Sequence, residues 1–242
     1  RDYRVGQISR MPNVTLYLGN RLLAADVREF GADHVLIATG ASWRRDGIGR
    51  WHARALVTLA AGAVYTPDDI MDGRRPGGEV LLFDDDHYYM GPVIAQLLAA
   101  SGARVRYVTT EGRAGAWSLY TQEQERAQRA LIEHGVAIEV NVALDAFDGT
   151  TATIGCIFTG RQRQCAATAV VLVTARLPDE ALYRELCGED DAAVNAPGAG
   201  AGAGHASVLR IGDCVQPALI ANAVYSGHRA ARELGGAAGA PR

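Results

Sequence analysis

The stretch VLLFDDDHYYMGPVIAQLLAASGARVRYV, residues 80–108, decides the fold of this chain. It opens with the apolar run Val80–Phe83, which is typical of a buried strand, and closes with a second apolar run at residues 105–108. Between the two runs, residues 92–100 place apolar side chains on one face of a helix, and Gly102 follows as a left-handed cap. The stretch therefore predicts a strand, a helix and a second strand that lies parallel to the first.

The same alternation of apolar runs and amphipathic stretches continues along the chain. Thr66, followed by Pro67 and two aspartates, is a typical helix start. The pattern predicts an α/β fold, a Rossmann-like parallel sheet with helices on both faces. Further strands are expected at residues 34–40, 136–140, 170–173 and 208–211, further helices at 121–134 and 217–234, and a turn at 145–149.

The glycine- and alanine-rich segment at residues 195–204 has no side chains with which to pack. Such a segment is typical of a flexible connection between domains. We therefore expect one domain at residues 76–204 and a second, discontinuous domain made from residues 1–75 and 205–242.

The composition of the chain argues against several classes of protein. The 242 residues include 28 glycines and 8 prolines, too few for a low-complexity chain, and 48% are apolar. The 24 basic and 27 acidic residues leave a net charge of −3, and the basic residues are scattered, so nucleic acid is not an expected partner. No apolar run approaches the roughly 20 residues of a membrane span, and the first residues do not resemble a secretory signal. A cytoplasmic protein without a membrane partner is expected.

No metal site and no catalytic residue are predicted. The four cysteines (156, 165, 187 and 214) are too far apart in sequence for a C-x2-C metal motif, and the six histidines show no paired spacing. A G-x-S-x-G nucleophile motif is also lacking. The three tryptophans (43, 51 and 117) are interpreted as core or interface packing residues, with electron transfer as the less favoured alternative.

The turn after Phe83 occupies the place of a dinucleotide-binding glycine motif. Gly91 lies eleven residues before Gly102, as the third glycine of G-x-G-x-x-G often does, but the first two positions then hold Asp86 and Tyr88. A tyrosine ring would fill space that a diphosphate needs. Two like charges about 4 Å apart repel by roughly 4 kcal/mol at an effective dielectric constant of 20. The attraction of a helix N-terminus for a phosphate offsets at most about 2 kcal/mol of this repulsion. Whether residues 84–86 face the phosphate site or form a solvated turn, NAD(P) binding is not expected.

Five stretches carry a family resemblance: residues 32–40, 66–73, 83–91, 173–178 and 211–213, the last with Ala223 and Gly227. In this order they resemble the C-terminal half of the trimethylamine, dimethylamine and histamine dehydrogenases, with the 2,4-dienoyl-CoA reductases as more distant relatives. The run DDDHYYMG is the most specific of them, whereas ATG and GD occur in many flavoproteins with two dinucleotide-binding domains.

The resemblance implies an NAD-binding-like domain with a degenerate glycine motif, inserted in a partial FAD-binding-like domain. It implies that FMN and a 4Fe-4S cluster belong to an N-terminal barrel region missing from this chain, and that FAD or ADP has only an incomplete site here. Implied partners are that barrel region or another copy of the chain, and an acceptor of the electron-transfer flavoprotein type.

Carried over residue by residue, the resemblance implies cofactor contacts at Ala38, Thr39, Gly40, Gly212 and Asp213. The structural alternatives are a satisfied strand-end hydroxyl for Thr39 and a polar turn residue for Asp213. Arg176 stands in the family's Thr-Gly-Arg-x-Pro segment, where Ala175 replaces the glycine.

Two functions follow from the resemblance. One is the C-terminal fragment of a flavin-dependent oxidoreductase that oxidises a small methylated amine and passes the electrons to an acceptor. The other is a nucleotide-binding or assembly module without redox activity of its own. A true NAD(P)H-dependent reductase is a third, less favoured, interpretation.

Overall fold

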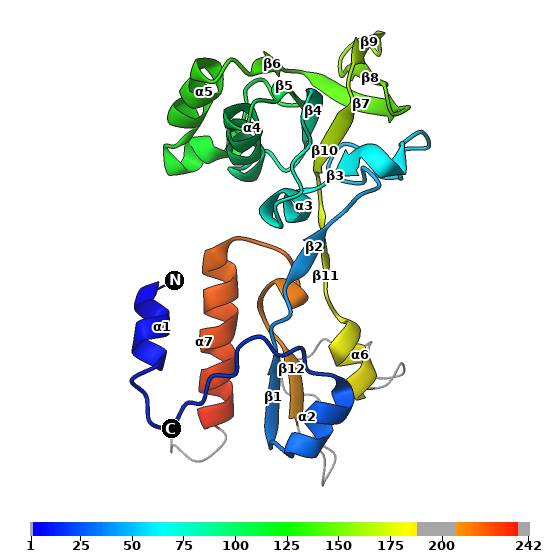
Figure 1. Ribbon diagram of the computed structural model, residues 1–242. Helices are drawn as coiled ribbons and strands as arrows, with labels where there is room; N and C mark the ends of the chain where they lie inside the picture. The colour runs from blue at the N-terminus through cyan, green and yellow to red at the C-terminus, as the bar shows by residue number, and fades with distance from the viewer. Residues whose placement is uncertain (1, 188–206, 237–242) are drawn as a thin grey trace. The chain divides into compact units, whose positions relative to one another are not determined.

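The computed structural model describes residues 2–187 and 207–236. The chain forms two compact units (Figure 1): unit 1 from Arg1–Thr39 and Asp179–Arg242, and unit 2 from Gly40–Pro178. The glycine-rich connection at 195–204 and the expected domain boundary at residue 204 lie outside the described residues.

A five-stranded parallel sheet forms the centre of unit 2, in the order β3-β10-β4-β5-β6. The strands expected at residues 80–83, 105–108 and 170–173 are all present. The order turns back between β4 and β10, since the chain runs from β4 through β5 to β6 and later returns to the other side of β4. The strands are β3 (Val64–Tyr65), β4 (Glu79–Asp84), β5 (Arg104–Thr109), β6 (Ala137–Glu139) and β10 (Ala169–Val173).

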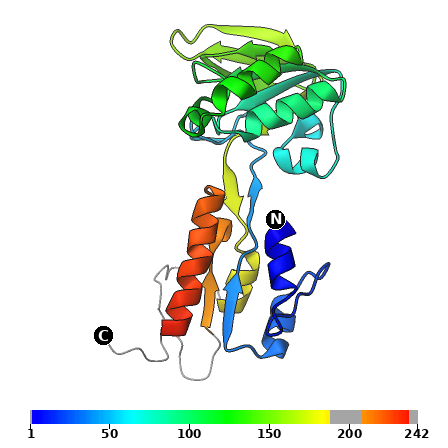
Figure 2. The ribbon, with the colours of Figure 1, turned by 90° about the vertical axis from the view of Figure 1, so that its left-hand side faces the viewer.

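Three helices cover one face of this sheet (Figure 2): α3 (Pro67–Met71), α4 (Met90–Ala100) and α5 (Gln124–Glu133). Ile94 and Leu98 of α4 are completely buried against Leu82 and Tyr107 of the strands. Burial of such side chains stabilises a fold by roughly 1.5–3 kcal/mol each. The helix predicted at 92–100 is confirmed. The one expected at 121–134 is preceded by a 3-10 turn, η2 (Ala116–Thr121).

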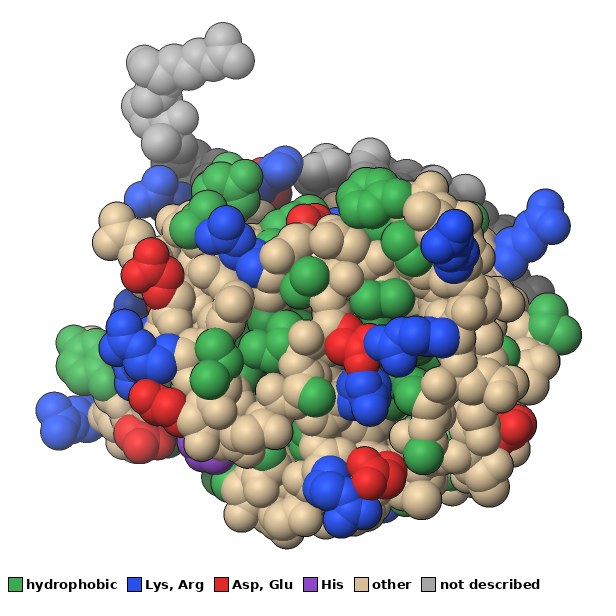
Figure 3. Space-filling view, turned by 90° about the horizontal axis from the view of Figure 1, so that it is seen from above, with side chains coloured by type: hydrophobic (Ala, Val, Ile, Leu, Met, Phe, Trp, Pro, Cys, Tyr) green, Lys and Arg blue, Asp and Glu red, His purple; other side chains and the backbone are tan. Residues whose placement is uncertain are grey.

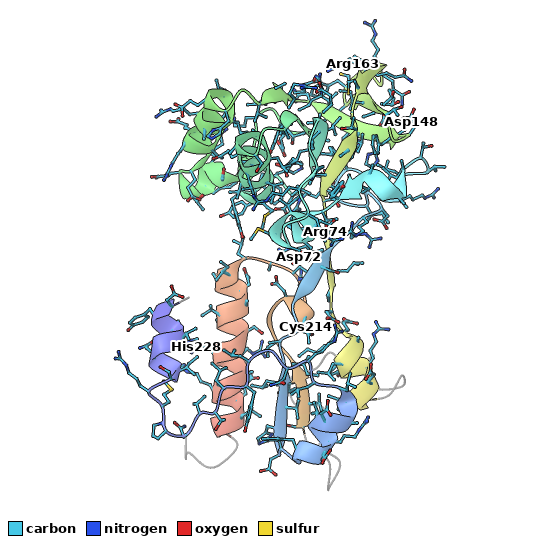
Figure 4. The ribbon with its side chains drawn as sticks, viewed as in Figure 1. Asp72, Arg74, Asp148, Arg163, Cys214 and His228 are labelled. Atoms are coloured by element: carbon cyan, nitrogen blue, oxygen red, sulfur yellow. The ribbon has the colours of Figure 1, made fainter. Side chains whose placement is uncertain are left out.

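The other face of the sheet is covered by strands, so the expectation of helices on both faces is wrong for unit 2. An antiparallel sheet of β7 (Val142–Phe147), β8 (Thr151–Cys156) and β9 (Gln162–Ala166) packs there. Because β7 continues to Phe147, the expected turn at 145–149 begins later, where the Asp148 carboxylate accepts bonds from the amides of residues 150 and 151. Figure 4 places Asp148 and Arg163 in this part of unit 2.

Residues 40–75 lie in the same compact unit as the strand–helix–strand stretch, which differs from the expected boundary at residue 75. The physical reason is that β3 pairs with β10, with Val64 opposite Val170. The helix α3 that follows begins as predicted, because Thr66 and Asp69 form a reciprocal capping box. A short antiparallel pair, β2 (Ala41–Trp43) with β11 (Arg176–Pro178), and the turn η1 (Ala61–Ala63) complete unit 2.

Unit 1 contains one parallel strand pair, β1 with β12, in which Ile37 lies opposite Arg210. Its core is small and centres on Ile37, Tyr183 and Cys214. The strands expected at 34–40 and 208–211 and the helix expected at 217–234 are present with shorter or shifted ends. The elements are α1 (Asp2–Ile8), α2 (Ala24–Phe30), β1 (His34–Ile37), α6 (Ala181–Cys187), β12 (Ser207–Arg210), η4 (Gly212–Cys214) and α7 (Ile220–Gly236).

Candidate functional site

The parallel pairing of β1 and β12 places the carboxyl ends of both strands at one edge of the sheet of unit 1. The amide of Ile211 donates to the carbonyl of Ile37 at 2.9 Å, which ties the two ends together. Ala38 and Thr39 follow β1, and Gly212 with Asp213 follow β12. Four of the five predicted cofactor residues therefore lie at this edge, where open α/β sheets bind ligands.

Gly212 needs to be glycine because its φ is 65°, in the left-handed region. Its amide donates to the Ser226 hydroxyl at 2.9 Å, so the turn is fastened to α7. The Asp213 carboxylate accepts a bond from the amide of Ala218 at 3.2 Å, and the Thr39 hydroxyl donates to the carbonyl of Asp179 at 2.5 Å. Both residues thus have the structural roles that the sequence left open as alternatives, and their cofactor contacts stay predictions.

Gly40 directly follows Thr39 as the first residue of unit 2, with a φ of 83°. A Cβ atom added here would meet no heavy atom within 4 Å, so the backbone of Gly40 is open to an approaching group. Ala38 and Thr39 are exposed. This stretch could bring the backbone close to a ligand.

The carboxyl ends of the parallel strands in unit 2 form a second sheet edge. Asp84, the last residue of β4, is fully buried and accepts bonds from the Tyr107 hydroxyl and from the amide of His87. Burial raises the pKa of Asp84 to about 7. Gly91 is the residue that makes room for this side chain, because an added Cβ would lie 2.6 Å from Asp84 Cγ. The third glycine of the motif therefore sits directly against the end of the strand.

Asp85 is also buried, and its carboxylate accepts bonds from the amides of Arg50 at 2.5 Å and Trp51 at 3.0 Å. The expectations for residues 84–86 are therefore wrong for Asp84 and Asp85. Neither carboxylate is solvated or directed at an open phosphate site, because internal donors engage both. Asp86 is half-buried, and burial raises its pKa although the charges of Arg176 and Arg50 oppose the rise.

His87, which the sequence analysis did not single out, lies at the centre of this turn. It has a φ of 65°, is buried, and its Nε2 atom lies 3.6 Å from Asp85. Burial lowers the pKa of His87. The ring of Tyr88 packs edge-on against Tyr89 at 5.3 Å, and the expected steric block of a diphosphate by Tyr88 stays a prediction.

Arg176 lies in β11, and its guanidinium stands 5.4 Å from the centre of the Trp43 ring. Its neighbour Ala175 accepts a bond from the amide of Arg44 at 2.9 Å. The segment that resembles Thr-Gly-Arg-x-Pro is thus held against the start of unit 2.

The described residues bring no group of three or more His, Cys, Asp or Glu side chains together that could hold a metal ion. All four cysteines are free, and Cys214 is buried in η4 of unit 1 (Figure 4). Within residues 2–187 and 207–236, no helix is both long enough and apolar enough to cross a membrane. On the face shown in Figure 3, basic and acidic side chains are interspersed.

Residues 65–157 match the family model of the OYE-like second alpha/beta domain. The chain is 28% identical to dimethylamine dehydrogenase from Hyphomicrobium sp. (strain x) over 260 aligned residues, which cover 97% of this chain and 34% of that protein. Histamine dehydrogenase from Rhizobium sp. 4-9 superimposes on the whole chain with a TM-score of 0.87 and 38% identity, and 36% of its own chain is covered.

A third relative is 6-hydroxypseudooxynicotine amine oxidase from Pseudomonas geniculata N1, with a TM-score of 0.85 and 41% identity over 95% of this chain and 33% of its own. The chain spans about a third of the length of each of these three relatives. With these matches along its whole length, the chain belongs to the family of dimethylamine dehydrogenase and histamine dehydrogenase.

Proposed function

We propose that this chain is the nucleotide-fold portion of a flavin-dependent amine oxidoreductase. The observation that carries the proposal is the match of nearly the entire chain to three relatives named for the oxidation of amines. The substrate class is a small methylated amine, and the electrons pass to an acceptor of the electron-transfer flavoprotein type. In such proteins the flavin supplies the redox chemistry, and the protein supplies binding, orientation and electrostatics.

The described residues of this chain do not gather the cysteines that an iron–sulfur cluster requires, since no group of metal-binding side chains is formed. FMN and the cluster therefore belong, in this proposal, to polypeptide outside the chain. The contribution of this chain is a nucleotide site in unit 1.

The edge of unit 1 formed by Ala38, Thr39, Gly212 and Asp213 fits the adenosine and diphosphate parts of ADP or FAD. Ala38 and Thr39 are exposed, so a phosphate can approach the main chain directly after β1. The carboxylate of Asp213 is an acceptor for ribose hydroxyls, which are hydrogen-bond donors. The left-handed turn at Gly212 is fastened to Ser226, so Asp213 is held at the end of β12.

Calorimetric titration of the chain with ADP tests this site. We expect Asp213→Asn to weaken ADP binding by about 10-fold or more, because it replaces a charged acceptor by a neutral one. Asp33→Asn is the matched control, since Asp33 precedes β1 at the opposite edge of the same strand pair. No ADP binding by the unaltered chain, or equal weakening by the two variants, would contradict the proposal.

An assembly module without redox activity is the second candidate, favoured by the exposed apolar side chains of unit 1. Tyr3, Leu18 and Phe30 are each more than 70% exposed, and α1 buries none of its residues. A helix that buries none of its residues leaves its apolar side chains available to a partner. A chain that binds neither ADP nor flavin but self-associates in sedimentation experiments would favour this candidate over the first.

A further inference from the structure

The crevice in which unit 2 would hold a dinucleotide is located by its strand order. The order β3-β10-β4-β5-β6 turns back between β4 and β10, and ligands of open α/β sheets bind at such a switch point, beyond the carboxyl ends of the strands. Here the two strand ends are tied together, because the amides of Asp85 and Asp86 both donate to the carbonyl of Val173, at 2.8 and 3.0 Å.

The backbone of residues 49–52, which we name the strap, lies over these two strand ends. Gly49 has so little room that an added Cβ would overlap the Asp85 carboxylate and lie 3.1 Å from Cβ of Thr174, the residue after β10. The amides of the next two residues, Arg50 and Trp51, donate to Asp85. The strap therefore contacts the residues that directly follow both β4 and β10.

Two further contacts hold the strap from its sides. The Arg50 guanidinium stacks 4.1 Å from the centre of the Trp117 ring, and Trp117 is itself fastened by a bond from its amide to the carbonyl of His87. The ring of His52 bonds through Nε2 to the carbonyl of Leu144 in β7 at 2.7 Å. The strap is thus held in place by three elements: η2 through Arg50, the turn after β4 through the amides that bind Asp85, and β7 through His52.

The donors at the switch point are of the kind that binds an anion, and the Asp85 carboxylate already occupies them. Backbone amides and an arginine are the usual donors to a phosphate, and here two amides bind a carboxylate of the same chain. The hydroxyl of Thr174 beneath the strap is buried without a hydrogen-bond partner. A ligand that reached the crevice would have to displace the strap and leave the buried charge of Asp85 unpaired, which is costly.

We propose that the strap, held by the Asp85 carboxylate as an internal anion, closes the switch-point crevice of unit 2 against the diphosphate of a dinucleotide. This inference concerns unit 2 and goes beyond the proposed function, whose nucleotide site lies in unit 1.

Hydrogen exchange measured by mass spectrometry on the full chain tests the proposal. We expect Asp85→Ala to raise the exchange rates of the amides of residues 50 and 51 by about 10- to 100-fold, the range for a lost bond to a charged acceptor. Gly49→Ala should loosen the same amides, because its Cβ displaces the strap. Asp86→Ala is the matched control: it removes the same charge from the same turn, and Asp86 acts on Arg50 through its charge.

Formate supplies the missing carboxylate in trans. We expect it to restore protection of the strap amides in Asp85→Ala, whereas chloride at the same ionic strength should not. In the unaltered chain, NADH at millimolar concentration should leave the exchange of residues 49–52 and 84–92 unchanged.

Any of the following results would overturn the proposal: unchanged exchange of the strap in both Asp85→Ala and Gly49→Ala, an equal effect of Asp86→Ala, no rescue by formate, or protection of the strap by NADH. Loss of protection in β10 as well, in both strap variants, would also overturn it, because the segment would then be part of the core. Failure of the ADP site in unit 1 would appear instead in peptides that contain residues 38–40 and 212–213.

Discussion

The buried carboxyl of Asp84 should make unit 2 less stable as the pH rises, and Asp84→Asn should remove that dependence. Burial raises the pKa of Asp84 from its ordinary value near 4 to about 7 in the folded chain. Between these values the folded state keeps a proton that the unfolded state releases. The contribution of Asp84 to the stability of unit 2 is therefore fully present below pH 4 and is lost as the pH rises through 7.

The size of the effect follows from the linkage relation. One pKa unit corresponds to about 1.4 kcal/mol, so integration between pH 5 and pH 8 gives a loss of roughly 3 kcal/mol from this one carboxyl. The amide in Asp84→Asn cannot titrate. Its oxygen can still accept from the His87 amide, and its NH2 group can donate to the Tyr107 hydroxyl, which in the unaltered chain donates to Asp84. His87, whose pKa burial lowers, contributes with the opposite sign, and its contribution cancels in the difference between the two proteins.

Urea unfolding followed by tryptophan fluorescence measures this difference, because all three tryptophans lie in unit 2. We expect the free energy of unfolding of Asp84→Asn, relative to that of the unaltered chain, to rise by about 3 kcal/mol between pH 5 and pH 8. Asp148→Asn is the control, since backbone hydrogen bonds lower the pKa of the exposed Asp148 carboxyl, which stays ionised throughout this range. Parallel stability curves for the unaltered chain and Asp84→Asn would refute the assignment of a protonated Asp84.

Other substitutions test single contacts. Gly91→Ala should destabilise unit 2 by about 1–3 kcal/mol in the same unfolding assay, because its Cβ would meet Asp84, whereas Gly112→Ala, with open space around it, should not. Gly212→Ala should lower the melting temperature of unit 1, followed by circular dichroism, because a φ of 65° costs a residue with a side chain about 1 kcal/mol or more. Asp69→Ala should cost at least roughly 1–2 kcal/mol of stability, because it removes the cap of α3 and the ion pairs of Asp69 with Arg45 and Arg74, and a smaller loss would contradict its capping role.

The strand–helix–strand stretch at residues 80–108 was predictable because its signals are local. Its apolar runs and its helix cap act within a few residues of each other, and β4, α4 and β5 appear where the pattern places them. The antiparallel strands β8 and β9 were not predicted. Most residues of β9 are exposed, and β8 alternates irregularly, so neither has the apolar run that marks a buried strand.

The role of Asp85 could not be predicted for a different reason. Its partners are backbone amides 34 and 35 residues earlier in the chain, and a backbone amide leaves no mark on the residue type. The close pair Gly47 and Gly49 is the one local signal, since Gly49 alone leaves room for the carboxylate. The number of acidic residues in the turn is evident from the sequence, but the burial of Asp84 and Asp85 is not.

The two sheet edges of this chain show why a nucleotide fold by itself does not specify a nucleotide site. Both edges follow parallel strands, and both combine glycine turns with aspartate. In unit 2, Asp84 and Asp85 are buried and accept hydrogen bonds from internal donors. A diphosphate would have to break these hydrogen bonds, and leave a buried charge without a partner, before it could form hydrogen bonds of its own. In unit 1, Thr39 and Asp213 also have internal partners, but Ala38 and Thr39 after β1 are exposed, so a ligand could reach them without unburying a charge. If either unit binds a nucleotide, this difference in burial favours unit 1, and the ordering follows from the burial of the charged groups rather than from the fold.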